Sequence, residues 1–217
     1  MSNELCVVVG AGPGIGLAVA RRFAREGFKV ALVARRKEAL ESYCEEIKQA
    51  GGEAYAFSAD AGDEQSLKAA FDQIKAQLGQ PTALIYNTYS SVPGSPSQLD
   101  PESMLNDFKV NVLGALLSAQ AVIPGMREQK KGTILFTGGG LALNPHPQYA
   151  SLAAGKAAMR NLAYSLGAEL EPEGIQAATV TVAGFVKPGT HFDPDLIAES
   201  FWQLHSQPSG QREIVYK

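Results

Sequence analysis

Leu5-Cys6-Val7-Val8-Val9-Gly10-Ala11-Gly12-Pro13-Gly14-Ile15-Gly16 is the stretch of this sequence that decides its fold. Residues 5–9 are apolar and rich in valine, which is typical of a parallel strand buried on both faces. From Ile15 onward, apolar residues recur at helical spacing. The stretch therefore predicts a strand that turns sharply into a helix, with the glycines forming the turn.

Such a turn aims the first free N–H groups of the helix, and the positive end of its dipole, at one point outside the sheet. A phosphate suits that point, and glycines let it approach the backbone closely. Gly10, Gly14 and Gly16 give the spacing G-x-x-x-G-x-G, with Gly12 inside the loop. Ile15 stands where the Rossmann G-x-G-x-x-G motif has its third glycine. The stretch predicts a dinucleotide-binding loop whose cofactor contacts are Gly10, Gly12, Gly14, Ile15 and Gly16, and a glycine turn without a ligand is the alternative.

Length, composition and charge limit the size of the domain and the kinds of partner that we expect. The chain has 217 residues, 45% of them hydrophobic, so it can bury the core of a single domain over residues 1–217. Its net charge of −3, without blocks of like charge, gives no reason to expect nucleic acid or a membrane as a partner. The first strand begins almost at the N-terminus without a signal-peptide pattern, and no apolar run is expected to approach a membrane span in length. We therefore expect a cytoplasmic protein.

Cysteine and histidine give no sign of a metal site. Cys6 lies in a predicted buried strand and Cys44 in a predicted helix, so we expect two reduced, structural cysteines. His146, His191 and His205 lack the spacing of metal ligands. The prediction is that the protein holds no metal.

Strands and helices alternate along the rest of the chain. The predicted later strands are residues 29–34, 53–59, 83–87, 133–137, 176–182 and 213–216. The predicted later helices cover about residues 35–50, 63–78, 101–128, 149–169 and 195–206, with an interruption near Pro124. This alternation predicts an α/β fold, a doubly wound, Rossmann-like parallel sheet of about seven strands with helices on both faces. Ligands bind such sheets beyond the carboxyl ends of the strands.

Three cations, Arg35-Arg36-Lys37, open the second predicted helix, where they oppose the helix dipole. In dinucleotide-binding folds, an acidic residue about 20 positions after the glycines binds the ribose 2′-hydroxyl of NAD, whereas an arginine accommodates the 2′-phosphate of NADP. Ala34 and Arg35 stand at that position here. Arg35 therefore favours NADP(H), and a solvated basic helix start is the alternative.

Over essentially its whole length the chain resembles the short-chain dehydrogenase/reductase family. The glycine pattern matches the cofactor loop of that family, and Ala34-Arg35 resembles its NADP-preferring members. The resemblance implies further cofactor contacts at positions downstream, namely Asp60 and Ala61 at the adenine, Asn87 at the nicotinamide pocket, Lys156 at the nicotinamide ribose, and Gly184 and Val186 along the carboxamide. Asn87 is the one match to the N-N-A-G motif of the family, because Tyr86, Thr88 and Tyr89 depart from it.

The catalytic signature of the family is Y-x-x-x-K, with a serine about 13 residues before the tyrosine. Lys156 fits the lysine, and Asn111 matches the asparagine that completes the catalytic tetrad of the family through a water. Leu152 stands at the tyrosine position and Gly139 at the serine position, so two of the four catalytic side chains are missing. A positioned general acid is worth roughly 10²–10⁴-fold in rate. The nearby candidates to replace it are Tyr149, on the helical face of Lys156, and Ser151, Thr137 and His146.

These features favour an NADP(H)-dependent oxidoreductase with an altered catalytic site. It would transfer hydride to or from a carbonyl, quinone or conjugated acceptor, and its small-molecule substrate stays unidentified. One alternative is a non-catalytic NADP(H)-binding sensor or assembly subunit, and another is a protein that has lost the cofactor site. Only a short segment, residues 187–192, could cover the cleft, so we expect the cleft to be open. The resemblance also implies a homodimer or homotetramer.

Overall fold

The structure is a computed structural model that describes residues 4–207 and 210–217. Its strands are β1 (Leu5–Val9), β2 (Lys29–Ala34), β3 (Glu53–Ser58), β4 (Ala83–Tyr86), β5 (Gly132–Gly139), β6 (Ile175–Val182) and β7 (Glu213–Tyr216). Its α-helices are α1 (Ile15–Arg25), α2 (Lys37–Gln49), α3 (Glu64–Leu78), α4 (Pro101–Phe108), α5 (Gly114–Gln129), α6 (Ala150–Leu170) and α7 (Pro194–Ser206). A π-helix, η1 (Lys109–Leu113), joins α4 to α5, and two 3₁₀ turns are η2 (Gly140–Ala142) and η3 (Glu171–Glu173).

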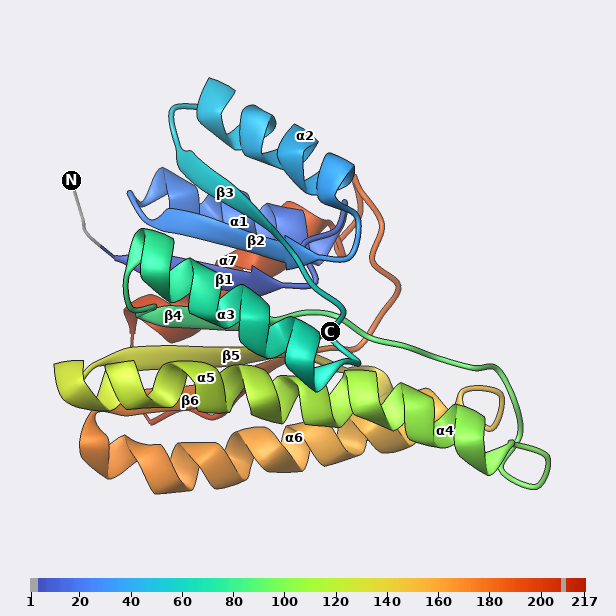
Figure 1. Ribbon diagram of the computed structural model, residues 1–217. Coiled ribbons are helices and arrows are strands. Elements are labelled where there is room, and N and C mark those ends of the chain that lie inside the picture. Colours follow the sequence, from blue (N-terminus) through green and yellow to red (C-terminus); the bar gives the residue numbers. More distant parts are fainter. Residues whose placement is uncertain (1–3, 208–209) are drawn as a thin grey trace.

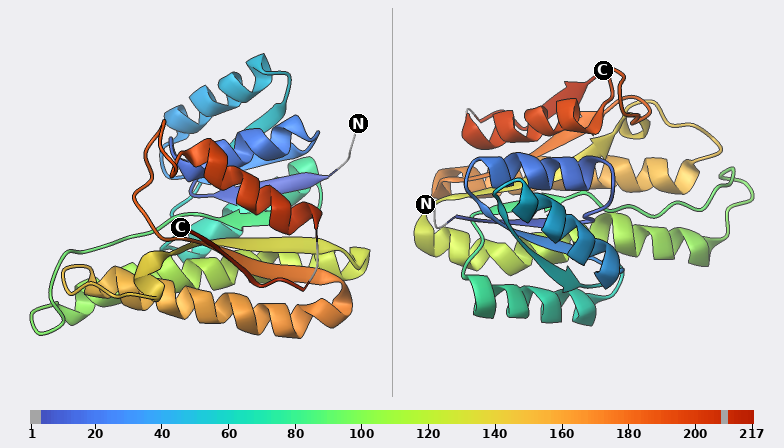
Figure 2. Two further views of the ribbon diagram at one scale, coloured as in Figure 1. Left: turned by 180° about the vertical axis from the view of Figure 1, so that it is seen from behind. Right: turned by 90° about the horizontal axis from the view of Figure 1, so that it is seen from above.

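The strands form one parallel sheet in the order β3-β2-β1-β4-β5-β6-β7. One hydrophobic core lies between the sheet and α1, α2 and α7, and a second lies between the sheet and α3, α5 and α6. Figure 1 and Figure 2 show the two helical layers on opposite faces of the sheet. The predicted doubly wound α/β fold is confirmed. Its strand order reverses between β1 and β4, the position at which such sheets bind ligands.

The predicted interruption near Pro124 is wrong, because α5 runs through this proline. Buried Val122, Ile123 and Met126 surround it and hold the helix on the sheet, which offsets the hydrogen bond that proline cannot donate. The backbone irregularity instead occurs earlier, as the π-helix η1. It follows that packing, and not the proline, determines the course of this helix.

The continuous helix Pro101–Gln129 has the length and apolar composition of a membrane span. The expectation that no stretch approaches this length is therefore wrong for this helix. Half of its most apolar window is buried within the protein, where α5 packs against β4, β5 and α3. Its apolar residues thus contribute to the second core.

His205 links α7 to the start of β5, at the amino ends of the strands, whereas the glycine loop lies at their carboxyl ends. Its Nδ1 lies 3.1 Å from the Thr133 hydroxyl, and its ring packs against Phe23, Phe28 and Trp202. Burial, together with the nearby Lys131 cation, lowers the pKa of His205, and the Glu4 carboxylate only partly opposes this shift. The folded protein therefore holds a neutral imidazole at neutral pH.

We expect His205 to make stability depend on pH. The unfolded chain binds this proton below about pH 6.5, whereas the folded chain binds it only at lower pH. The stabilisation is therefore complete above about pH 6.5 and is lost as the pH falls through the lowered pKa. Urea unfolding at pH 7.5 and 5.5 should show a smaller pH-dependent loss of unfolding free energy in His205→Phe than in the wild type. His146→Gln, at an exposed position, is the control, and an unchanged pH dependence in His205→Phe would contradict the prediction.

Candidate functional site

The glycine loop between β1 and α1 is shaped by close backbone contacts. Gly10 has a φ of +87°, and a Cβ added there would lie 2.4 Å from the Thr88 nitrogen. A Cβ on Gly16 would lie 2.4 Å from the Gly10 oxygen. By contrast, nothing lies within 4 Å of a Cβ built on Gly12 or Gly14. Gly10 and Gly16 therefore permit the turn, and Gly12 and Gly14 face open space in front of α1. The first turn of α1 has no acidic residue and no side-chain cap.

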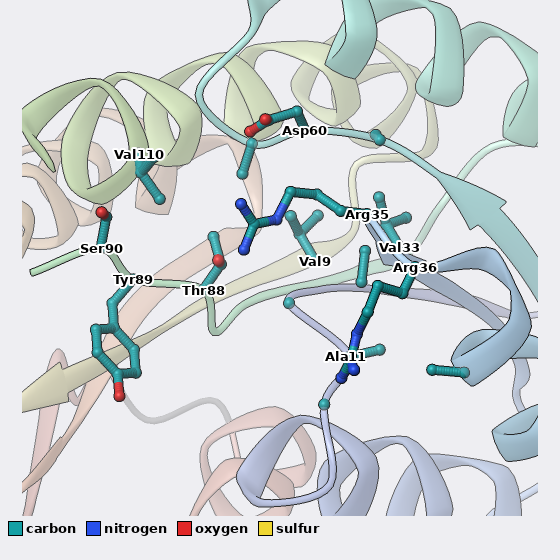
Figure 3. A pocket seen from close by; sticks show the side chains of 16 residues that line it. Val9, Ala11, Val33, Arg35, Arg36, Asp60, Thr88, Tyr89, Ser90 and Val110 are labelled. Carbon is teal, nitrogen blue, oxygen red and sulfur yellow. The ribbon is translucent and has the colours of Figure 1, made fainter. Parts of the chain in front are cut away.

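One hollow, which we call the arginine hollow, opens beyond the carboxyl ends of β1 and β2 and has a volume of about 570 Å³. Its walls come from the glycine loop, the start of α2 and the segments that follow β3 and β4. They include five of the predicted cofactor residues, Gly10, Gly12, Arg35, Asp60 and Ala61. Figure 3 shows Arg35 extending toward the side of Asp60 and Val110, and Arg36 extending toward Ala11.

The two arginines supply the positive charge of the arginine hollow. Among the described residues, neither Arg35 nor Arg36 forms a salt bridge, and both are exposed. Arg36 also precedes α2 without capping it through its side chain. Charged, planar guanidinium groups beside a hollow are suited to binding phosphate.

A second hollow, the lysine hollow, has a volume of about 550 Å³ and shares Gly10, Gly12, Thr88 and Tyr89 with the first. Its walls include six further predicted cofactor residues, Gly14, Ile15, Asn87, Lys156, Gly184 and Val186. The seventh, Gly16, lines neither hollow. Leu152 and Val182 add apolar surface. The two hollows thus form one continuous site across the point where the strand order reverses.

Lys156 is the only charged side chain among the described residues that line the lysine hollow. It is buried, with 7% of its surface exposed, and its Nζ donates a hydrogen bond of 2.6 Å to the Thr137 oxygen. Burial lowers the pKa of the Lys156 ammonium to about 8. The side chain is therefore a positioned amine that can change its charge near neutral pH.

Leu152 and Gly139 both lie near Lys156. Leu152 shares the hollow with it, one helical turn earlier on α6. A Cβ on Gly139 would lie 3.6 to 3.7 Å from the Lys156 side chain, which is ordinary contact distance. The register that aligns Lys156 with the family lysine thus places both substituted positions at this site.

Asn87 ties the glycine loop to β5. Its Nδ2 donates to the Gly10 oxygen, and its Oδ1 accepts from the Thr137 hydroxyl, each at 2.9 Å. The preceding residue, Tyr86, is buried and donates to the Val110 oxygen in η1. Burial and the nearby Asp60 carboxylate raise the pKa of Tyr86, so its phenol stays neutral. These bonds fix the floor of the lysine hollow.

The loop after β4 is held by two buried side chains of the long helix. Asn111, in η1, accepts from the Ser90 nitrogen and donates to the Ser90 oxygen, each at 2.8 Å. Asp107 accepts from the Ser90 hydroxyl, the Val92 nitrogen and the Ser151 hydroxyl. Burial would raise the pKa of Asp107, but these hydrogen bonds outweigh it and lower the pKa. Asn111 therefore positions the loop and does not line either hollow.

The four side chains predicted as candidates for the acid lie outside the two hollows or are already hydrogen-bonded. Tyr149 precedes α6, its ring packs near His146, and neither residue lines the arginine hollow or the lysine hollow. Ser151 donates to Asp107, and Thr137 donates to Asn87. The structure thus brings Lys156 to the cofactor residues but does not bring Tyr149 there.

Tyr89 is a site residue that the sequence analysis did not select. It lines both hollows, 63% of its surface is exposed, and the Lys156 Nζ lies 5.9 Å from its ring centroid. The available signal was its position, because a tyrosine there replaces the glycine of N-N-A-G. A departure from a motif can itself mark a functional side chain.

The segment between β6 and α7 is anchored beside the lysine hollow. A Cβ on Gly184 would lie 2.1 Å from the Phe192 ring, which shows how closely that ring covers the glycine. His191 stacks on Tyr216 at 5.0 Å between centroids, and the Tyr216 hydroxyl donates to the His191 oxygen at 2.7 Å. The segment is therefore held on β7.

Comparisons with known proteins place the chain among related sequences and folds. A family model described as short chain dehydrogenase matches residues 4–194. A 2-(S)-hydroxypropyl-CoM dehydrogenase 3 of Xanthobacter autotrophicus is 32% identical over 97% of this chain and 84% of its own length. A short chain dehydrogenase of Pseudocercospora fijiensis is 33% identical over 81% of this chain, and the match spans only 57% of that protein. A solved metagenomic short-chain oxidoreductase in complex with NADP superposes with a TM-score of 0.86 at 29% identity, covering 99% of this chain and 96% of that one.

Proposed function

This chain belongs to the short-chain dehydrogenase family of oxidoreductases, and on that premise we propose that it binds NADP(H) across the two hollows and transfers hydride with an altered catalytic site. The observation that carries the proposal is the continuity of the site. Open space in front of Gly12 and Gly14 lies between the two ends of the site. Arg35 and Arg36, which form no salt bridge with another described residue, line one end, and buried Lys156 lines the other. The acceptor would be a carbonyl, quinone or conjugated compound.

The residues that line the two hollows are suited to binding NADP(H). The open glycines and the uncapped start of α1 leave N–H groups for the pyrophosphate. Arg35 and Arg36 would hold the 2′-phosphate, and Lys156 would donate to the nicotinamide ribose. The bound cofactor would supply the hydride. In support, the related metagenomic oxidoreductase was solved with NADP.

A titration with NADPH tests the proposal before any substrate is known. We expect Lys156→Met to weaken NADPH binding about 10-fold or more, because it removes a hydrogen bond from a charged donor. In the wild type, affinity should fall as the pH rises through about 8, where the Lys156 ammonium loses its proton. This pH dependence should be absent from Lys156→Met. Lys68→Met, at an exposed position on α3, is the matched control, and a wild-type protein that does not bind NADPH would refute the proposal.

A non-catalytic NADP(H)-binding protein is the second candidate. It is favoured by Leu152 and Gly139, which leave Lys156 without the neighbouring hydroxyls of the family signature. It predicts NADPH binding with no oxidation by any acceptor beyond that of Lys156→Met. A panel of aldehydes, ketones and quinones measured with both proteins separates the two candidates.

A further inference from the structure

We infer that Tyr89 is the proton donor of the lysine hollow, and that it protonates the substrate oxygen, which Leu152 cannot do because it has no proton to give. The inference rests on the proposed NADP(H)-dependent function. It assigns the acid of the reaction to the loop after β4, whereas the family signature would place it on α6.

Tyr89 is the one phenol among the described residues that line this hollow. The other hydroxyls there belong to Thr88 and Thr137, and that of Thr137 is already donated to Asn87. Aliphatic hydroxyls are also far weaker acids than phenols. Leu152 has no proton to give, and Tyr149 and His146 lie outside the hollow. Tyr89 is thus the remaining side chain with suitable chemistry.

The contacts of Tyr89 leave its hydroxyl available to donate a proton. The Lys156 Nζ lies 5.9 Å from the centroid of its ring, so the ring lies beside the one charged side chain among the described residues of this hollow. Its hydroxyl makes no hydrogen bond to another described residue. Its backbone neighbour Ser90 is held on both sides by Asn111. The base of the side chain is therefore fixed, and its phenol is free to meet an acceptor.

The proposed step is a carbonyl reduction. With a bound cofactor supplying hydride, the carbonyl carbon would gain a C–H bond and the C=O electron pair would move onto oxygen. Tyr89 then breaks its O–H bond and gives that proton to the oxygen, which completes the alcohol. A proton from solvent (H₃O⁺) would then return to the phenolate, so that the alcohol and NADP⁺ are the products and the protein is unchanged at the end.

Turnover with aldehydes tests the assignment. With NADPH and a panel of substituted benzaldehydes, Tyr89→Phe should lower kcat about 10²–10⁴-fold while changing the dissociation constant for NADPH less than threefold. A solvent deuterium isotope effect on kcat should be present in the wild type and should change in the residual activity of Tyr89→Phe. Tyr164→Phe is the control, at a position of α6 that lines neither hollow and whose hydroxyl donates to Glu213, and it should retain wild-type kcat.

Tyrosine nitration gives a readout that needs no turnover. Because Tyr89 lines both hollows, saturating NADP⁺ should slow its nitration by tetranitromethane at least tenfold, as measured by peptide mass spectrometry. Nitration of Tyr164, which is partly exposed outside the site, should be unaffected. Unchanged nitration of Tyr89 in a protein that binds NADP⁺ would overturn the assignment.

The outcomes separate this inference from the proposed function. If NADPH binds but no aldehyde is reduced, or Tyr89→Phe keeps more than a third of wild-type kcat, Tyr89 is not the acid and cofactor binding stands. If NADPH does not bind to a folded wild-type protein, the proposed function fails and the inference fails with it. Loss of kcat and NADP⁺ protection together support it.

Discussion

Aldehyde reduction should return when a hydroxyl is put back on α6 in a protein that lacks the Tyr89 hydroxyl. We expect Tyr89→Phe/Leu152→Tyr to reduce benzaldehyde about 10²–10⁴-fold faster than Tyr89→Phe/Leu152→Phe. The two proteins differ by one oxygen atom, so packing effects of the larger ring cancel. Leu152 already lines the hollow with Lys156, which places the new phenol one turn from that amine.

The measurement is steady-state NADPH oxidation, with NADPH affinity determined in parallel for both proteins. Adding Gly139→Ser should raise the rate by about another 10²-fold, the usual contribution of a donor to the developing oxyanion. The Lys156 side chain leaves ordinary contact distance for the serine Cβ. Equal rates in the tyrosine and phenylalanine proteins would show that position 152 does not face the reacting carbonyl.

Cofactor preference should disappear when the arginine hollow loses its charge. We expect Arg35→Ala/Arg36→Ala to weaken NADPH binding about 10²–10³-fold, since two charge-assisted hydrogen bonds to phosphate are lost. NADH binding should change less than threefold, because NADH has no 2′-phosphate. Neither arginine is held in a salt bridge with another described residue, so their removal leaves no buried charge unpaired.

Titrations of both cofactors at low and at moderate salt measure this preference. Arg25→Ala, at the far end of α1, is the matched control for a general loss of positive charge. If the double variant still prefers NADPH, the two arginines are a solvated helix start, and the 2′-phosphate is held elsewhere.

The fold could be predicted from the sequence because buried parallel strands appear as short apolar runs and amphipathic helices as apolar residues at helical spacing. The apolar run at residues 5–9 forms β1, and the helices predicted over about residues 35–50 and 63–78 form as Lys37–Gln49 and Glu64–Leu78. Pro124 was misread, since its effect depends on the buried neighbours that hold α5 in place. The local sequence pattern therefore predicts the strands and helices, whereas tertiary packing explains why α5 continues through Pro124.

The site was only partly predictable, since its catalytic side depends on contacts between distant segments. Arg35 and Lys156 follow from spacing along one strand or helix. The bonding of Asn111 to Ser90 and of Ser151 to Asp107 crosses from one segment to another. The approach of Tyr89 to Lys156 joins residues 67 positions apart in the chain. Spacing within a single motif cannot reveal such a pair.

The anchoring of residues 187–193 on β7 bears on how quickly the site exchanges its contents. His191 stacks on Tyr216 and Phe192 packs on Gly184, so contacts within the chain hold this segment. In enzymes with a mobile lid, reopening of the lid commonly limits turnover. With the segment already fixed, the residence time of a bound nucleotide would be set by its own contacts with the two hollows, and stopped-flow release should follow a single exponential.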